Sequence, residues 1–425
     1  MSGWREKSVT ESFRTDIMKR LLQINPVLRT STSTGRIVRE IGDTAMAAGW
    51  ESYIAYSKGR DGIMPCTSEV LPVGDRASVV WHGIVTRLSD RHGLASSAAT
   101  RRFVKEIERL RPDIIHIHNI HGYFLDYRIL CSYLSKCDIP VVWTVHDCWM
   151  YTGHCYYYTA AGCSRWQTGC GKCPQRKEFP KSLFVDRSAQ NWEDKKNAFT
   201  SLPHDRLVVV PVSEWLRQEM SRSFMKYCRF KVIHNGIDTD IFTCVDDREV
   251  REKYGLGDRH IILGVASIWS QKKGFGDFIE MSGRLRDDEV IVLVGIEESR
   301  LRYLPHNIVG ITRTDNVSEL AALYSAADVF VNPTWQDNYP TVNLEAISCG
   351  TPVVTYGTGG SPESVTSGTG YVIGTGDVPG LLGAVRKIES AGKAAYSTTC
   401  RQYATDNFRK EDRYSEYIKL YEELI

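Results

Sequence analysis

Short apolar runs alternate with amphipathic segments along most of the chain. The run at residues 18–26 predicts a first strand, and a predicted helix over 36–48 and a second strand over 52–56 follow it. A further helix over 99–110 carries an apolar stripe and leads into the strand-like IIHIH and, after another helix, PVVWTVHD. Strands that alternate with helices predict a parallel sheet, with ligands bound at the carboxyl ends of its strands.

The same alternation starts again near residue 206. LVVVPVSEWL, FKVIHNGIDTDIF, HIILGVASIW, EVIVLVGI and NIVGIT follow in order, before the apolar ADVFVNPTW. The pattern predicts an α/β protein with two doubly wound domains, and turn-forming residues place the boundary within 199–206. The predicted order is a flexible extension at 1–17, a first domain at 18–203, a second domain at 204–405 and a terminal helix at 406–425.

The most informative polar residues lie in DNYPTVNLEAISCGTPVV, residues 337–354, which GTGGSPESV follows closely. The pattern predicts a loop, a helix and a strand, with Asp337 before the helix and Glu345 inside it. Backbone N–H groups at a helix N-terminus attract phosphate, whereas a carboxylate there binds hydroxyl groups. The two acids therefore suit a nucleotide sugar, and a surface acid beside a capping acid is the alternative.

These motifs resemble those of a known enzyme family. D-x7-E followed by A-x-x-x-G-T-P-V-V and G-G-x-P-E resembles the donor-site signature of family 4 glycosyltransferases, whose usual form is E-x7-E. VIHNGIDTDIF and VVWTVHD resemble the family's linker and first-domain signatures, so the resemblance covers nearly all of residues 18–425. It implies the GT-B fold, which has two Rossmann-like domains, a deep interdomain cleft and a terminal helix that crosses back onto the first domain.

The resemblance implies three catalytic residues, His146, Lys273 and Asp337. Lys273 matches the family's lysine that contacts donor phosphates, where a fixed cation stabilises the leaving nucleotide diphosphate. Asp337 takes the place of the family's first Glu as a contact to the donor sugar. His146 is expected to bind the donor sugar near the reacting carbon.

The donor site is expected to include further residues. Glu345 matches the family's ribose contact, and Gly35 resembles its glycine loop, where a residue without Cβ lets a ligand approach the backbone. Ser267 stands where the family often has an Arg, so a second cation is expected from Lys272 or Arg313. The other predicted donor contacts are Asp147, Asn338 and Thr341. His116 and His118 are expected to pack in the core or the cleft wall.

A cysteine-rich insert at residues 148–180 follows His146. Cys155, Cys163, Cys170 and Cys173 supply four thiols, and the last two form C-x2-C, a spacing that suits one zinc ion. A redox-active pair and reduced, buried thiols are the alternatives, with Cys148 and His154 as substitute ligands. A structural zinc would shape the insert beside the cleft. The resemblance implies no catalytic metal.

Composition limits the possible partners and compartments. The chain has 425 residues, enough for two domains, and 42% hydrophobic residues with a net charge of +2 exclude disorder and a nucleic-acid-binding charge excess. No apolar run reaches the roughly 20 residues that span a bilayer. Residues 1–17 lack a signal peptide's apolar core, so we expect a cytoplasmic protein.

The predicted helix over 99–110 carries basic residues that favour peripheral association with the cytoplasmic face of the inner membrane. A solvated face with interspersed acids is the alternative. The basic residues are Arg101, Arg102, Lys105, Arg109 and Arg111.

The sequence thus predicts a retaining hexosyltransferase that moves a sugar from a nucleotide-diphosphate sugar to an acceptor hydroxyl. The resemblance extends to transferases of bacterial exopolysaccharide and capsule clusters, including the colanic acid type, which carry a similar HDCW…TGHC…C…CP insert. The acceptor is expected to be a carbohydrate or a lipid-linked sugar. Two alternatives stay open: a sugar-nucleotide 2-epimerase on the same fold and a non-catalytic sugar-nucleotide-binding protein.

Overall fold

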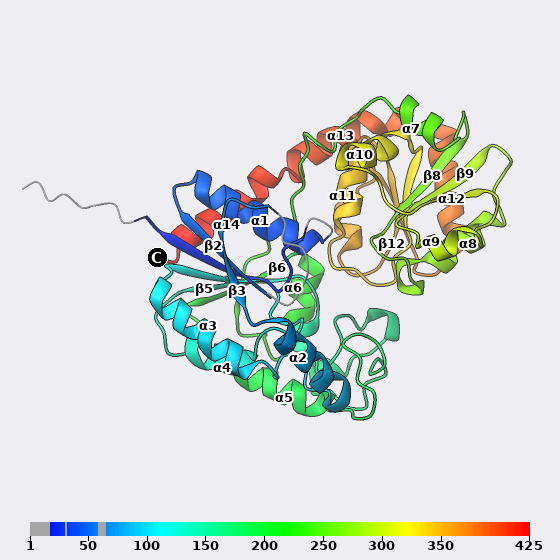
Figure 1. Cartoon of the computed structure of the whole chain (residues 1–425). Helices are drawn as coiled ribbons and strands as arrows, with labels where there is room; N and C mark the ends of the chain where they lie inside the picture. Colours follow the sequence, from blue (N-terminus) through cyan, green and yellow to red (C-terminus); the bar gives the residue numbers. More distant parts are fainter. Residues whose placement is uncertain (1–17, 30–31, 58–64) are drawn as a thin grey trace, which may run out of the picture.

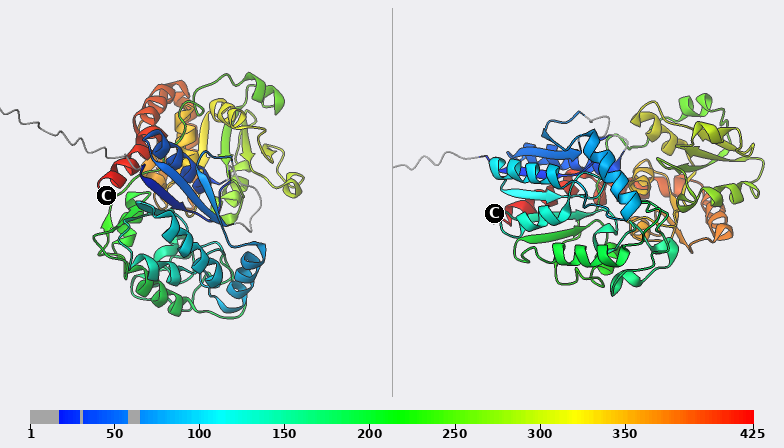
Figure 2. Two further views of the ribbon diagram at one scale, coloured as in Figure 1. Left: turned by 60° about the vertical axis from the view of Figure 1, so that its left-hand side comes forward. Right: turned by 60° about the horizontal axis from the view of Figure 1, so that its bottom comes forward.

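Two parallel β-sheets, each packed against helices, form the two lobes of the protein (Figure 1). The structure is a computed structural model that describes residues 18–29, 32–57 and 65–425. The predicted extension at 1–17 lies outside the described residues. Figure 2 shows the two lobes from two further sides. The predicted α/β class with two doubly wound domains is confirmed.

The first sheet has the strand order β3-β2-β1-β4-β5-β6-β7. Its central strands are short apolar runs buried on both faces, which is typical of a parallel sheet covered by helices. Its strands are β1 (Arg20–Ile24), β2 (Glu51–Ser57), β3 (Glu69–Val73), β4 (Ile114–Ile117), β5 (Val141–Val145), β6 (Leu207–Pro211) and β7 (Arg229–Phe230). The helices of this part are α1 (Ser33–Ala47), α2 (Arg76–Ser89), α3 (Ser97–Leu110), α4 (Tyr127–Leu134), α5 (Ser188–Phe199) and α6 (Glu214–Met220).

The second sheet has the strand order β10-β9-β8-β11-β12-β13. Its strands are β8 (His260–Val265), β9 (Glu289–Val294), β10 (Ile308–Ile311), β11 (Val329–Asn332), β12 (Val353–Tyr356) and β13 (Gly370–Ile373). The helices are α7 (Arg248–Lys253), α8 (Phe275–Ser282), α9 (Glu298–Leu301), α10 (Val317–Ala326), α11 (Thr341–Ser348), α12 (Val378–Ala391), α13 (Ala394–Asn407) and α14 (Lys410–Glu422). In both sheets the order reverses beside the first strand, so the carboxyl ends of the strands border a crevice.

The predicted domain boundary within 199–206 is wrong. Strand β6 pairs with β5, and β7 pairs with β6, so LVVVP and the residues after it belong to the first sheet. The turn residues at 201–205 connect α5 to β6 inside one domain. VIHNGIDTDIF is mostly irregular chain between the sheets, and Ile237 forms an isolated bridge with Arg409.

The terminal helix α14 returns to the first lobe, as predicted, and packs against α1. Its Tyr414, Tyr417 and Tyr421 are buried, and the Tyr421 hydroxyl lies 2.6 Å from Nδ1 of His116. In Figure 2 the red end of the chain lies beside the blue elements of the first lobe. The predicted burial of His116 and His118 is confirmed.

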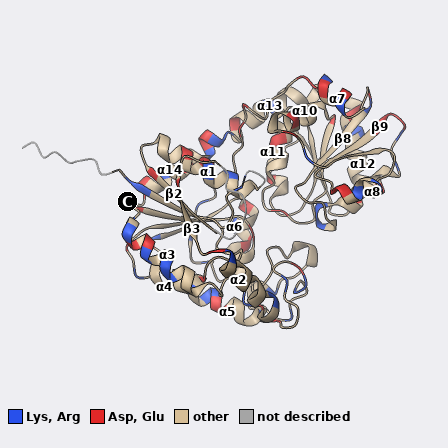
Figure 3. Cartoon of the chain, viewed as in Figure 1, with Lys and Arg blue, Asp and Glu red and all other residues tan. Residues whose placement is uncertain are grey.

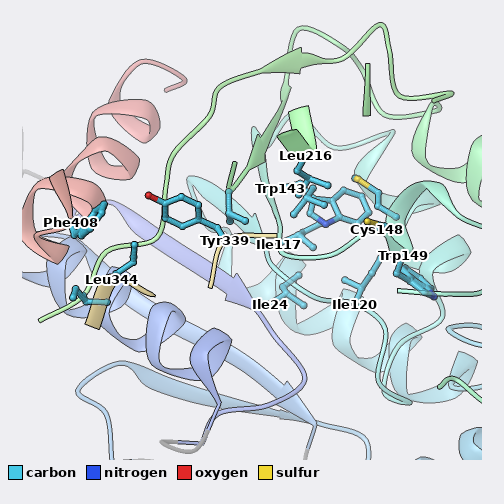
Figure 4. Packing of buried hydrophobic residues seen from close by; sticks show 14 of the residues in the cluster. Ile24, Ile117, Ile120, Trp143, Cys148, Trp149, Leu216, Tyr339, Leu344 and Phe408 are labelled. Atoms are coloured by element: carbon cyan, nitrogen blue, oxygen red, sulfur yellow. The ribbon is translucent and has the colours of Figure 1, made fainter. Parts of the chain in front are cut away.

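One cluster of buried apolar residues continues from the first lobe into the second (Figure 4). It includes Ile24 of β1 and Trp143 of β5 in the first sheet, then Tyr339, Leu344 and Phe408. The two lobes therefore share packed surface around the start of α11.

Candidate functional site

A pocket lies between the lobes, where the carboxyl ends of strands from both sheets meet. The first lobe contributes the start of α1 and the residues after β5, and the second contributes the ends of β8 and β11 and the start of α11. Six predicted site residues line it: His146, Asp147, Lys273, Asp337, Asn338 and Thr341. Asn338 also joins the lobes, because its side-chain amide donates to the His146 carbonyl at 2.6 Å.

His146 ends a chain of buried hydrogen bonds that orients its ring. The Gln23 amide donates to the Val38 carbonyl at 2.9 Å, so its oxygen, 3.1 Å from His118 Nε2, accepts a hydrogen there. His118 Nδ1 then accepts from His146 Nε2, 3.1 Å away. Burial lowers the pKa of His146 to about 4, and its ring is neutral at neutral pH. The neutral ring thus keeps Nδ1 as a hydrogen-bond acceptor.

Acid is expected to weaken the fold partly through His146. Its pKa falls from 6.5 to about 4 on folding, so the unfolded chain takes up a proton that the folded chain rejects. This contribution to stability is complete above the unfolded pKa and is lost as the pH falls toward 4, at about 1.4 kcal/mol per pH unit for each proton. Denaturant titrations should show a smaller loss of unfolding free energy between neutral pH and about pH 5 in His146→Gln than in wild type. Equal losses would contradict this assignment.

Asp147 is held by the first lobe. Its carboxylate accepts from His121 Nε2 at 2.9 Å and from the Trp149 backbone N–H at 2.8 Å. Burial alone would raise the pKa of Asp147, but the interaction with His121 and the Trp149 N–H lower it overall. The carboxylate is therefore charged and fixed at the pocket wall.

Lys273 and Asp337 face each other in the pocket. Lys273 Nζ lies 2.6 Å from Asp337 Oδ2, and the other Asp337 oxygen accepts from the Asn338 backbone N–H at 2.9 Å. Gly274, next to Lys273, has a φ of 77° and packs against Pro333, so a Cβ there would collide. The fold thus brings these two charged side chains, both predicted to lie near strand ends, into contact in the pocket.

The two residues predicted to supply a second cation lie elsewhere. Lys272 turns toward the cysteine-rich insert, with Nζ 3.2 Å from both Gln175 Oε1 and Glu178 Oε2. Arg313 is exposed after β10, and neither residue lines the pocket. Sequence position alone did not show that both side chains point away from the pocket.

Arg36 is the pocket cation that sequence reasoning missed. It lines the pocket together with Ser267, and its guanidinium lies 2.9 Å from Glu345 Oε1. Glu345 is buried behind the pocket lining, where it also accepts from the Tyr324 hydroxyl at 3.0 Å. The available signal was the placement of Arg36 next to Gly35 at a helix start, but its partner is 309 residues away.

The predicted role of Gly35 needs correction. Helix α1 begins at Ser33, so Gly35 lies in its first turn rather than before it. A Cβ at Gly35 would lie 2.7 Å from the Arg29 carbonyl oxygen and from Thr32 Oγ1. The chain's own backbone therefore occupies the space that was assigned to a ligand.

The four predicted zinc ligands lie around one small cavity in the insert, together with His154 and Trp166. All four are free thiols, and the Cys170 sulfur accepts from the Gly153 backbone N–H at 3.2 Å. Across residues 18–29, 32–57 and 65–425, no group of three or more His, Cys, Asp or Glu side chains is arranged to hold a metal ion. Of the substitutes, His154 is engaged by Asp90 at 2.6 Å.

The zinc site stays a prediction. Metal analysis of protein purified without added zinc should find about one zinc per chain. The metal should be lost in Cys170→Ser and in Cys173→Ser but kept in Cys228→Ser, which lies outside the insert. Metal-free, active protein with four titratable thiols would rule the site out.

Comparisons with known proteins agree with this geometry. Residues 34–241 match the description "Glycosyltransferase Family 4", and residues 259–390 match "Glycosyl transferases group 1". The chain is 23% identical over 420 residues to the provisionally named colanic acid biosynthesis glycosyl transferase WcaC of Escherichia coli strain K12, covering 95% of this chain and 100% of that protein. It is 31% identical over 242 residues to a GDP-mannose-dependent alpha-(1-6)-phosphatidylinositol monomannoside mannosyltransferase of Mycolicibacterium smegmatis, covering 51% and 63% of the two chains.

Solved structures show the same architecture. Sucrose-phosphate synthase of Thermosynechococcus elongatus superposes with a TM-score of 0.71 at 16% identity, over 96% of this chain and 99% of that one. Anabaena HepE in complex with UDP and glucose gives a TM-score of 0.66 at 16% identity, over 96% and 100%. The chain therefore belongs to the family 4 glycosyltransferases and has the GT-B fold.

Proposed function

We propose that this protein is a retaining glycosyltransferase that transfers a hexose from a nucleotide-diphosphate sugar to an acceptor hydroxyl in exopolysaccharide assembly. The observation that carries the proposal is the pocket between the lobes, which joins His146 and Asp147 of the first lobe to Lys273 and Asp337 of the second. A donor bound there would contact both sheets at once.

The donor diphosphate would bind at the start of α11, between two cations. Pro340, Thr341 and Val342 line the pocket at this helix N-terminus, where the helix dipole favours an anion. In the structure Lys273 is paired with Asp337 and Arg36 with Glu345. Phosphates that draw on both cations would free the carboxylates to accept from hydroxyl groups, Asp337 from the sugar and Glu345 from the ribose.

The chemistry follows from these charges. As the bond to the diphosphate breaks, negative charge grows on the leaving phosphate, and cations fixed beside it lower the barrier. His146 Nδ1 would accept from a sugar hydroxyl and hold the reacting carbon in place. For retention, the acceptor attacks from the face that the diphosphate leaves, and a phosphate oxygen takes the acceptor's proton. We assign no catalytic metal and no covalent nucleophile.

One relative and one structural neighbour support the substrate class. The E. coli relative is named for colanic acid biosynthesis, and HepE was solved with UDP and glucose. By analogy with these proteins, we infer that this chain uses a nucleotide-sugar donor and a carbohydrate or lipid-linked acceptor at the cytoplasmic side of the membrane.

A screen of nucleotide-sugar hydrolysis tests the proposal, because it reports the donor before the acceptor is known. We expect slow hydrolysis of one donor, faster turnover when a suitable acceptor is present, and an unchanged anomeric configuration in the product by NMR. Release of an epimerised donor would indicate a 2-epimerase. Nucleotide binding without turnover across broad donor and acceptor panels would contradict an enzymatic role.

A further inference from the structure

Helix α2 carries an apolar stripe that faces solvent rather than the core. Val80 is 54% exposed, Trp81 59%, Ile84 43% and Leu88 49%. Trp81, Ile84 and Leu88 are three and four positions apart and Val80 adjoins Trp81, so the four lie on one side of the helix, while His82, Gly83 and Thr86 are buried. Within the described residues, an amphipathic helix therefore presents its apolar side outward.

The end of the cysteine-rich insert and the residues that follow it extend this stripe. The Leu183 backbone N–H donates to the Arg87 carbonyl near the end of α2 at 2.8 Å. Leu183 and its neighbour Phe184 are 42% and 73% exposed, and Phe179 is 50% exposed. We call the combined surface the α2 patch, made of Val80, Trp81, Ile84, Leu88, Phe179, Leu183 and Phe184. Contiguous exposed apolar surface of this kind marks a binding face.

Positive charge borders the α2 patch. The basic residues on its two segments are Arg76, Arg87, Arg176, Lys177 and Lys181. Helix α2 itself contains no acid, and the exposed Asp75 that caps its N-terminus accepts from the Ser78 backbone N–H. In residues 176–184 the single acid, Glu178, lies 3.2 Å from Lys272. An apolar stripe flanked by Lys and Arg suits an anionic lipid surface, because apolar side chains enter the headgroup boundary while cations meet phosphate.

Helix α3, where the sequence placed membrane binding, lacks this combination. Its basic residues are exposed, but Glu106 and Glu108 lie among them, and Arg109 pairs with Glu106 at 2.6 Å. Figure 3 shows α3 in mixed blue and red, whereas α2 is largely tan. The large apolar residues of α3, Phe103 and Ile107, are buried.

The α2 patch is connected to the donor pocket through the insert. Phe179 contacts Tyr156 with ring centroids 5.0 Å apart, and the next residue, Tyr157, lines the pocket. Thr159 reaches the second lobe, where its hydroxyl lies 3.3 Å from the Trp335 carbonyl. The cysteine-rich insert therefore contributes both to the α2 patch and to the first-lobe wall of the pocket.

We propose that the α2 patch docks the protein onto an anionic lipid bilayer and so brings the pocket to acceptors that are anchored there. The delivery of acceptors to the pocket rests on the proposed transferase function, whereas the docking itself does not. None of the described helices is both long enough and apolar enough to cross a bilayer, so attachment would be peripheral. A second copy of the chain is the competing occupant of the patch.

Vesicle co-sedimentation with the full-length protein tests the proposal. We expect binding to phosphatidylcholine vesicles that contain phosphatidylglycerol, weaker binding to pure phosphatidylcholine, and a decline with added salt. Trp81→Glu combined with Ile84→Glu should reduce binding at least about tenfold. Both side chains are exposed, so the fold and nucleotide-sugar hydrolysis should stay unchanged. The matched control, Arg101→Glu with Lys105→Glu on α3, should bind nearly as wild type.

Several results would overturn the docking surface. These are absence of binding by wild type, equal binding by the α2 variant, or loss of binding only in the α3 control. Light scattering adds another: a dimer that the α2 variant dissociates would show that the patch pairs two copies. Hydrolysis is measured without vesicles, so intact hydrolysis with failed binding removes this inference alone, and failed hydrolysis with intact binding removes the transferase proposal alone.

Discussion

Replacing Lys273 with alanine is expected to lower kcat about 100-fold or more. The Lys273 side chain lines the pocket, with its Nζ 2.6 Å from Asp337 Oδ2. A fixed cation at this point stabilises charge that is larger in the transition state than in the bound donor, so kcat falls more than affinity. The side chain is 41% exposed, so its truncation should leave the melting temperature nearly unchanged.

Lys272 provides the matched control within the same turn. It contacts Gln175 and Glu178 outside the pocket, and the Lys272→Ala variant should change kcat less than about threefold, as expected for an exposed ion pair. Kinetics on the donor identified by hydrolysis would measure both variants. If both lysines mattered equally, general positive charge rather than position would be responsible, and the assignment of Lys273 would fail.

The residues that follow strands were predictable because their positions depend on local pattern. His146 and Asp147 come directly after the apolar VVWTV, and Lys273 lies a short loop beyond HIILGV. In a parallel sheet such residues gather at one edge whatever the connections are. This is why one motif on each lobe was enough to place both walls of the pocket.

The domain boundary was not predictable by the same reasoning. The apolar LVVVP of β6 is as suitable for the first sheet as for the second, and only its pairing with β5 decides. The turn before it is an ordinary helix-to-strand connection, which a sequence pattern does not distinguish from a linker. Hydrogen bonding between strands far apart in the chain supplies the missing information.

Arg36 was missed for a related reason. Its neighbours in sequence mark a helix start, but its ion-pair partner, Glu345, belongs to the other lobe. Ser267 indicated only that a cation was needed, and the nearby Lys272 and Arg313 were the local candidates. The folded chain instead brings the guanidinium from the opposite wall, so a charge absent from one lobe is supplied by the other.

Removing the Arg36 guanidinium should have the second large effect. In Arg36→Met the donor dissociation constant should rise about 10- to 100-fold, because a charged hydrogen bond to phosphate is lost. The free energy of unfolding should also fall by about 1–3 kcal/mol, since the carboxylate of Glu345 stays buried without its cation. Arg39→Met, one turn along α1 and paired with Glu40 and Asp43, is the control for general charge.

The double variant Arg36→Met with Glu345→Gln separates the two effects. Glutamine keeps an oxygen for the Tyr324 hydroxyl and carries no charge, so stability should return toward wild type. Affinity for the donor should not return. Inorganic pyrophosphate isolates the phosphate contact of Arg36, because it has no ribose for residue 345 to contact. Calorimetric titration should find weak pyrophosphate binding in Arg36→Met and in the double variant, but near-normal binding in Glu345→Gln. If the double variant regained both stability and pyrophosphate affinity, Arg36 would serve only to hold Glu345, and the second phosphate cation would have to be sought elsewhere.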